Sequence, residues 1–286
     1  VVTATQMAVV SAAAKDSTLE LASSGLAIVP NPSLVVRRLD LAISSERVRL
    51  KYVVLNLGAA DVTSLVTWPL PEDNFVRFEI TSDGKPLKPS LEQHALAFRL
   101  DVTSLLKDQG LPLFPFAETV GSRLAALPDA VFQSMLENGI ARVEGHRRHP
   151  SWTYRATAFW RQVFKAERST EIAVSFVPVL GSGDLGADSL ASFGQSHCLT
   201  GAKAKAIQQR IEGGGAVDAV WLTHALTFGS SWSGPVKRAR ITVELQDANT
   251  IVATCHAGFK PAGPTLLEWE ATDFEPSSDL SILLVR

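Results

Sequence analysis

The sequence predicts a mainly β fold, built as two β-sandwich-like antiparallel halves with a short helical insertion and one further helix. From Leu34 onward, apolar and polar residues alternate with a period of two over many short segments, as in strands that cover a core with one face. About ten such segments occur, separated by turn residues, and helical stretches are few. Strands do not alternate regularly with long helices, so a parallel α/β sheet is not expected.

The strand candidates follow one another along the chain. The clearest is 238–245, where every second residue is apolar and its neighbours are charged or polar. The tetrapeptide SDGK at 82–85 has the composition of a tight turn. In chain order the candidates are 34–43, 47–54, 62–68, 75–80, 95–100, 152–161, 172–179, 238–245, 266–271 and 280–285.

Two stretches break this alternation and predict helices. At 127–139, a proline suits the first turn, apolar residues recur on one face, and Gly139 can end the helix in a left-handed conformation. At 201–212, Thr200 is a candidate N-cap and a run of three glycines follows the last turn. The glycine-rich segment 181–186 is expected to be a loop.

The domain organisation follows from this order of elements. Small residues just before position 15 fit the cleavage rule of a signal peptide, so the first residues are either a remnant of one or an apolar arm. The expected parts are an arm at 1–15, a β-sandwich-like domain at 16–115, a helical insertion at 116–150 and a β-rich domain at 151–286.

Composition and charge exclude several classes of partner. Apolar residues make up 46% of the chain and charged residues 20%, so a sizeable core can form. The net charge of −2 gives no basic footprint, so neither nucleic acid nor an anionic membrane surface is an expected partner. No long uncharged apolar run is present, so no transmembrane span is expected.

The chain has two cysteines, Cys198 and Cys255. They fit one disulfide, which would persist in an oxidising compartment such as the periplasm. Two alternatives stay open: two separate buried thiols, or a Cys2His2 zinc site completed by the adjacent His197 and His256. Neighbouring residues of a strand point to opposite faces, which disfavours the zinc site. We therefore predict the disulfide and no metal.

No catalytic residues and no cofactor can be assigned from motifs. His146 and His149 have the H-x-x-H spacing of metal ligands, but two arginines lie between them and would repel a cation, so a surface loop is expected. The string GSSWSG at 229–234 misses the G-x-S-x-G spacing of a hydrolase nucleophile by one residue. Glu268 and Glu270 alternate with apolar residues, which places them on the solvent face of a strand.

Aromatic residues outside the strands are the candidate binding residues. Trp232 lies in a segment rich in serine and glycine and is the best candidate for an exposed aromatic ring. Phe114 and Phe116 flank a proline at the start of the helical insertion. All three could act as anchors of an interface.

Several strings taken together resemble a known family. They are DSTLELASSGL at 16–26, VRLKYVVLNLGAADVTSLVTWPLP at 48–71, DVTSLL at 101–106 and SSWSGP at 230–235. In this order they are similar to the bacterial domain of unknown function 4424 family, from about Asp16 to the end of the chain. The resemblance implies an exported, periplasmic, β-rich protein with no assigned activity. The stretch DVTSLVTWPLP is also similar to vault and inter-α-trypsin-type β-sandwich domains, over a short length only.

These observations favour an exported, non-enzymatic protein, periplasmic or secreted, that binds a partner protein or a component of the cell envelope. One alternative is a hydrolase of a cell-envelope polymer, with a carboxylate or histidine brought into place by strand pairing. Another is a periplasmic carrier of small molecules, which would need a closed apolar pocket of at least ~300 Å³ between the two halves.

Overall fold

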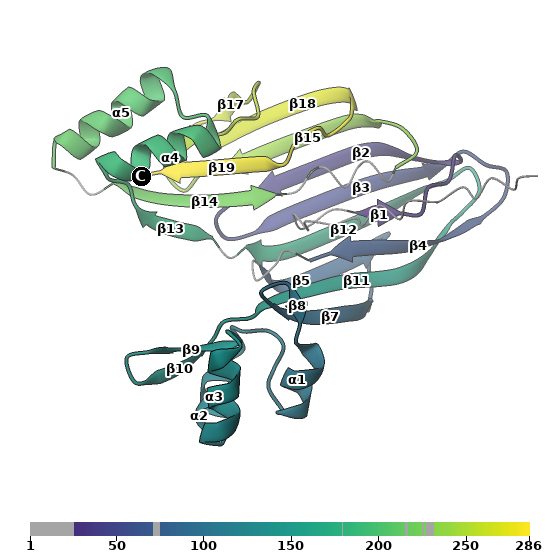
Figure 1. Ribbon diagram of the computed structural model, residues 1–286. Helices are drawn as coiled ribbons and strands as arrows, with labels where there is room; N and C mark the ends of the chain where they lie inside the picture. The colour runs from purple at the N-terminus through teal and green to yellow at the C-terminus, as the bar shows by residue number, and fades with distance from the viewer. Residues whose placement is uncertain (1–25, 71–74, 179, 215–216, 225, 227–231) are drawn as a thin grey trace, which may run out of the picture.

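The predicted mainly β fold class is confirmed. The computed structural model describes residues 26–70, 75–178, 180–214, 217–224, 226 and 232–286. Its strands form an eight-stranded, a five-stranded and a four-stranded sheet and one separate hairpin (Figure 1). The N-terminal arm expected at 1–15 lies outside the described residues.

The largest sheet has eight strands. Among them only β15 and β2 run parallel, and the other neighbours are antiparallel. In spatial order the strands are β17 (Lys260–Gly263), β18 (Leu266–Phe274), β15 (Val236–Glu244), β2 (Leu34–Ile43), β3 (Val48–Asn56), β12 (Ser169–Pro178), β5 (Phe75–Ser82) and β6 (Lys85–Pro86).

The two smaller sheets are antiparallel throughout their described pairs. The five-stranded sheet has the order β1 (Ala27–Ile28), β4 (Val62–Pro69), β11 (Thr153–Phe164), β7 (Ser90–Ala97) and β8 (Leu100–Asp101). The four-stranded sheet has the order β13 (Gly181–Asp184), β14 (Asp218–His224), β19 (Leu280–Val285) and β16 (Ile251–Ala253).

The main core lies between the eight-stranded sheet and the two smaller ones. The alternating apolar residues of β2, β3, β12 and β15 all belong to it, together with inward residues of β4, β11, β14 and β19. Trp68 and Phe164 are its largest fully buried side chains. The opposite face of the eight-stranded sheet carries charged and small residues, and Arg49, Lys51 and Glu79 on it are exposed.

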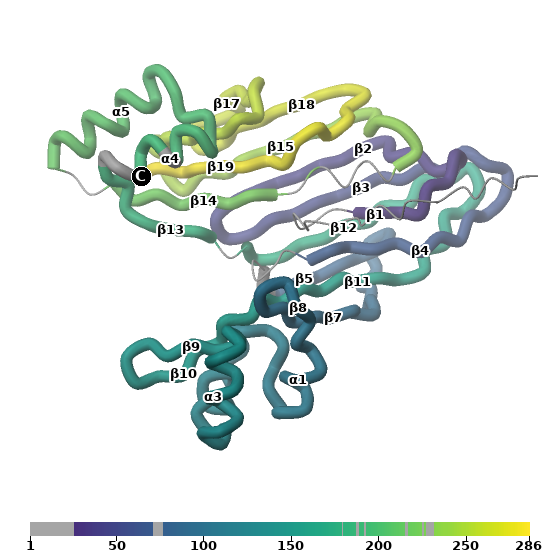
Figure 2. The backbone as a smooth tube through the Cα atoms, viewed as in Figure 1, coloured from purple at the N-terminus to yellow at the C-terminus, as the bar shows by residue number. Residues whose placement is uncertain are grey.

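A helical module, residues 103–150, projects from one end of this sandwich (Figures 1 and 2). It contains α1 (Thr103–Asp108), α2 (Val120–Ala125), α3 (Asp129–Glu137) and the hairpin of β9 (Ala141–Glu144) and β10 (Arg147–Pro150). Leu106, Leu124, Phe132 and Met135 form a second core with Trp152, just before β11, and with two alanines of β7. The helix predicted at 127–139 is confirmed as α3, and Gly139 after it has φ 65°.

A second pair of helices, α4 (Ala187–His197) and α5 (Gly201–Glu212), lies beside the four-stranded sheet. Ile207 of α5 packs with residues of β14 and β19 in a third core. The helix predicted at 201–212 is confirmed, although Thr200 makes no side-chain capping bond. The sequence predicted one helix in this part of the chain, and the structure has two.

The loop predicted at 181–186 was wrong, because Gly181–Asp184 form β13 and pair with β14. Glycine at position 181 allows close packing against the neighbouring strand. A Cβ added at Gly181 would lie 2.2 Å from ring atoms of Trp221 on the neighbouring strand. Glycine therefore lets the indole ring lie directly on the strand backbone.

The sheets do not separate at the helical insertion. Strands on both sides of residues 116–150 share the eight-stranded and the five-stranded sheet: β12 pairs with β3 and β5, and β11 pairs with β4 and β7. The parts 16–115 and 151–286 are therefore interleaved. Alternation within a segment reports which face is buried, and it carries no information on which distant strand lies beside it.

Candidate functional site

Trp232, the expected exposed aromatic, is half-buried and forms internal contacts. Its Nε1 donates a hydrogen bond to the carbonyl oxygen of Leu26 over 2.7 Å, and its ring meets Tyr52 edge-on with centroids 5.6 Å apart. Residues 229–231 of the same string lie outside the described residues. Trp232 thus links the start of the described chain to the main core, and these contacts leave its side chain only partly exposed.

Phe114 and Phe116 lie together at the entry of the helical module. Phe114 is half-buried and packs edge-on against Tyr154, with centroids 5.5 Å apart. Phe116 stacks edge-on against Phe114 at 5.6 Å, but 63% of its surface is exposed. One ring therefore supports the other, and Phe116 is presented to solvent in a fixed position.

Phe116 borders a groove of about 730 Å³, which we call the Phe116 groove. One wall is the segment from Pro115 through α2, with small apolar residues such as Val120 and Ala125. The other wall is the basic end of the β9–β10 hairpin, residues 146–150. The groove is therefore apolar on one side and cationic on the other.

The basic wall is held by Arg148. Its guanidinium donates hydrogen bonds to the carbonyl oxygens of Leu124 and Leu127 over 3.2 and 2.8 Å, pairs with Asp129, and lies 4.3 Å from the centre of the Phe132 ring. Arg142 also donates to the carbonyl oxygen of Pro150. These bonds fix β10 against α2 and α3, so the wall is preorganised.

The neighbouring Arg147 and His146 have a different role. Both are exposed, and neither side chain has a hydrogen bond or ion pair with any other described residue. His149, by contrast, lies 3.9 Å from a carboxylate oxygen of Glu144. The surface loop expected at 146–149 is a hairpin turn followed by β10, with Gly145 at φ 62° in the turn.

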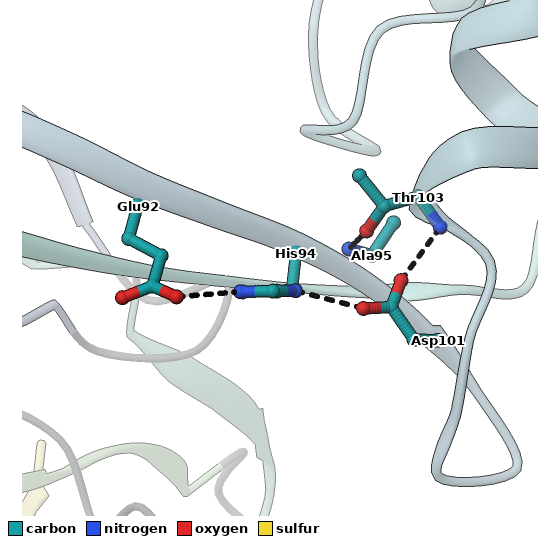
Figure 3. A network of polar contacts seen from close by, with 5 residues as sticks. All are labelled: Glu92, His94, Ala95, Asp101 and Thr103. Carbon is teal, nitrogen blue, oxygen red and sulfur yellow. Dashed lines mark hydrogen bonds and ion pairs between the residues drawn. The ribbon is translucent and has the colours of Figure 1, made fainter.

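A polar network that the sequence did not reveal surrounds His94 on β7 (Figure 3). Nδ1 of His94 lies 2.8 Å from Asp101 and Nε2 lies 3.3 Å from Glu92. The hydrogen bond to Asp101, and then that to Glu92, raises the pKa of His94 because both carboxylates stabilise the protonated ring. The pKa of Asp101 is lowered to about 2, first by its bonds with Thr103 and then by that with His94.

This network organises the start of α1. Asp101 accepts a hydrogen bond from the backbone N–H of Thr103, and the Thr103 hydroxyl oxygen accepts one from the N–H of Ala95, both over 2.8 Å. Both nitrogens of His94 are bonded to carboxylates, so neither is available to take a proton from a substrate. The motif DVTSLL at 101–106 thus stabilises the start of α1. An Asp two residues before a Thr at a helix start could have predicted this arrangement from the sequence.

The structure joins Cys198 and Cys255 in a disulfide, which links the end of α4 to the segment after β16. Thiolate ligands for zinc are therefore absent from this pair. The adjacent histidines have different neighbours: His197 is buried against Phe193, and His256 meets Trp269 edge-on with centroids 4.6 Å apart. Burial lowers the pKa of both rings. The described residues contain no group of three or more His, Cys, Asp or Glu that could hold a metal ion.

Glu268 and Glu270 lie on the solvent-facing side of β18, as expected. Glu268 pairs with Arg240 over 2.6 Å, and Glu270 lies 3.7 Å from the same guanidinium. No described helix is both long and apolar enough to cross a membrane.

Comparison with known proteins identifies a family and distant similarity to solved structures. The family described as "Domain of unknown function (DUF4424)" matches residues 14–283. No curated protein matches. A crystal structure of a Legionella pneumophila protein described as a "putative nutrient binding protein" is similar at 12% identity with a TM-score of 0.47, over 92% of this chain and 70% of that one. Because the family match covers nearly the whole chain, the protein belongs to the domain of unknown function 4424 family.

Proposed function

We propose that the protein is an exported binding protein that holds an acidic segment of a partner protein in the Phe116 groove. The observation that carries this proposal is the exposed ring of Phe116 beside Arg147 and His146, two basic side chains without an acidic partner among the described residues. Exposed aromatic and arginine side chains are the residue types that contribute most to protein–protein binding. The disulfide supports export, because such bonds persist in oxidising compartments.

The walls of the groove select the kind of segment. An apolar side chain of the partner would pack against Phe116 and Ala125, which are both exposed, and a carboxylate would pair with Arg147. Since Arg148 and Phe114 hold the two walls in place internally, binding requires little rearrangement of the backbone.

Site-specific photo-crosslinking in the native cells tests the proposal. Benzoylphenylalanine replaces Phe116 in one variant and Leu100, which is 71% exposed on β8, in a control. We expect a crosslinked partner from position 116 alone, attached through a peptide rich in Asp or Glu. The substitution Arg147→Glu should abolish this product, and Arg161→Glu on the exposed side of β11 should leave it.

Two results would contradict the proposal. One is equal crosslinking from positions 116 and 100, which would indicate a non-specific apolar contact. The other is a product from position 116 that persists in the Arg147→Glu variant, because the charge would then have no role in recognition.

A further inference from the structure

The uncovered face of the eight-stranded sheet contains a second hollow, of about 380 Å³. Its position follows from the strand register. Arg49 on β3 lies opposite Ala42 on β2 and opposite Ser175 on β12. The next row places Ala173 of β12 opposite Lys51. Short side chains therefore flank a long basic one, and the surface is depressed where they lie.

The rim of this hollow is charged, but most of its charges neutralise one another. Three of its four basic residues pair with carboxylates: Arg38 with Asp40 at 2.7 Å, Lys51 with Glu171 at 3.2 Å and Arg240 with Glu268 at 2.6 Å. The acidic Glu79 of the rim is likewise paired, with Arg47 at 3.5 Å.

Arg49 is the exception. Its side chain is exposed, lines the hollow, and has no hydrogen bond or ion pair with another residue in the described part of the chain. A guanidinium group offers two parallel N–H donors that match the two oxygens of a carboxylate. The hollow thus combines one available cation with a floor of the short side chains of Ala42 and Ala173.

We propose that this hollow, which we call the Arg49 hollow, binds a small carboxylate with an apolar body. The carboxylate pairs with Arg49, and the apolar body lies over Ala42 and Ala173. The volume falls within the range of about 300–1,000 Å³ that is usual for small-molecule sites. The paired acids of the rim offer no free negative charge, so a cationic ligand has no partner there. The proposal is independent of the Phe116 groove, which lies on the helical module.

Titration with decanoate, followed by NMR of protein labelled at the alanine methyl groups, tests this inference. We expect saturable shifts of the Ala42 and Ala173 methyls, with the methyl of Ala125 in the Phe116 groove unchanged. Decanol, which has the same chain length and no charge, should bind at least tenfold more weakly. The variant Arg49→Gln should lose at least tenfold in affinity for decanoate, and Arg161→Gln should retain the affinity of the wild type.

Arg49 is exposed, so both variants should unfold at the temperature of the wild-type protein, which a circular dichroism melt verifies. The inference is overturned if decanoate leaves the methyls of Ala42 and Ala173 unshifted at millimolar concentration. Equal binding of decanoate and decanol, or unchanged affinity in Arg49→Gln, would also overturn it. Loss of partner crosslinking at position 116 would leave it intact, because the two sites share no residue.

Discussion

Reduction of the disulfide should destabilise the protein by about 4 kcal/mol. Cys198 and Cys255 are 57 residues apart, and the entropy lost by closing a loop of that length in the unfolded chain corresponds to ~4 kcal/mol. This is a large part of the ~5–15 kcal/mol by which a typical domain is stable. The effect should be greatest around α4 and α5, because the third core that holds them contains few fully buried side chains such as Ile207 and Val285.

Urea unfolding with and without reductant measures this loss. With a slope of about 3 kcal/mol per M, a loss of ~4 kcal/mol lowers the midpoint by roughly 1.3 M. The double variant Cys198→Ala, Cys255→Ala should reproduce the reduced midpoint and should not respond to reductant. Hydrogen exchange should show the earliest loss of protection in α4 and α5. An unchanged midpoint, or loss of protection first in β2 and β3, would refute the reasoning.

Three further predictions concern single side chains. Burial lowers the pKa of His224 to about 4, so between about pH 6.5 and 4 the unfolded state binds a proton that the folded state does not. The free energy of unfolding, measured with urea, should therefore fall by about 3 kcal/mol on acidification through that window. The variant His224→Leu should remove this dependence. The pKa of His94 is raised, so its contribution is present at low pH and is lost as the pH rises through the raised value; NMR titration of the ring should give a lower pKa in Asp101→Asn. Trp232→Ala should cost about 2 kcal/mol in a thermal melt, less than for a fully buried ring, whereas Trp232→Phe should retain the packing against Tyr52 and lose less.

Local patterns predicted the strands and two helices well. The segment 238–245 alternates because one face of β15 lies on the main core and the other meets solvent. The order of apolar and polar residues within the segment is therefore enough to predict this strand. The helix before Gly139, and the end of that helix at Gly139, were also predicted from local residues. The strand β13 was missed because its glycines serve the packing of Trp221, a residue about forty positions later in the chain.

The sites were predicted only in part, for the same reason. Phe116 could be singled out as an aromatic residue outside any strand, and His146 and His149 as an H-x-x-H pair in a surface loop, but only folding brings them to one groove. The internal contacts of Trp232 could not be predicted, because its partners, Leu26 and Tyr52, lie about 200 residues earlier. The Arg49 hollow depends on the register of β3 with β2 and β12, which periodicity within one strand does not specify.

The parallel pairing of β2 with β15 has a consequence for how the chain reaches its folded form. β2 ends at Ile43, and β15, which pairs with one edge of it, begins at Val236. During synthesis, β2 is therefore complete almost 200 residues before β15 begins. Until then the backbone amides and carbonyls along that edge are open to any other extended chain. A fragment that stops before Val236 should therefore self-associate, because the edge of β2 is paired only after β15 has been synthesised.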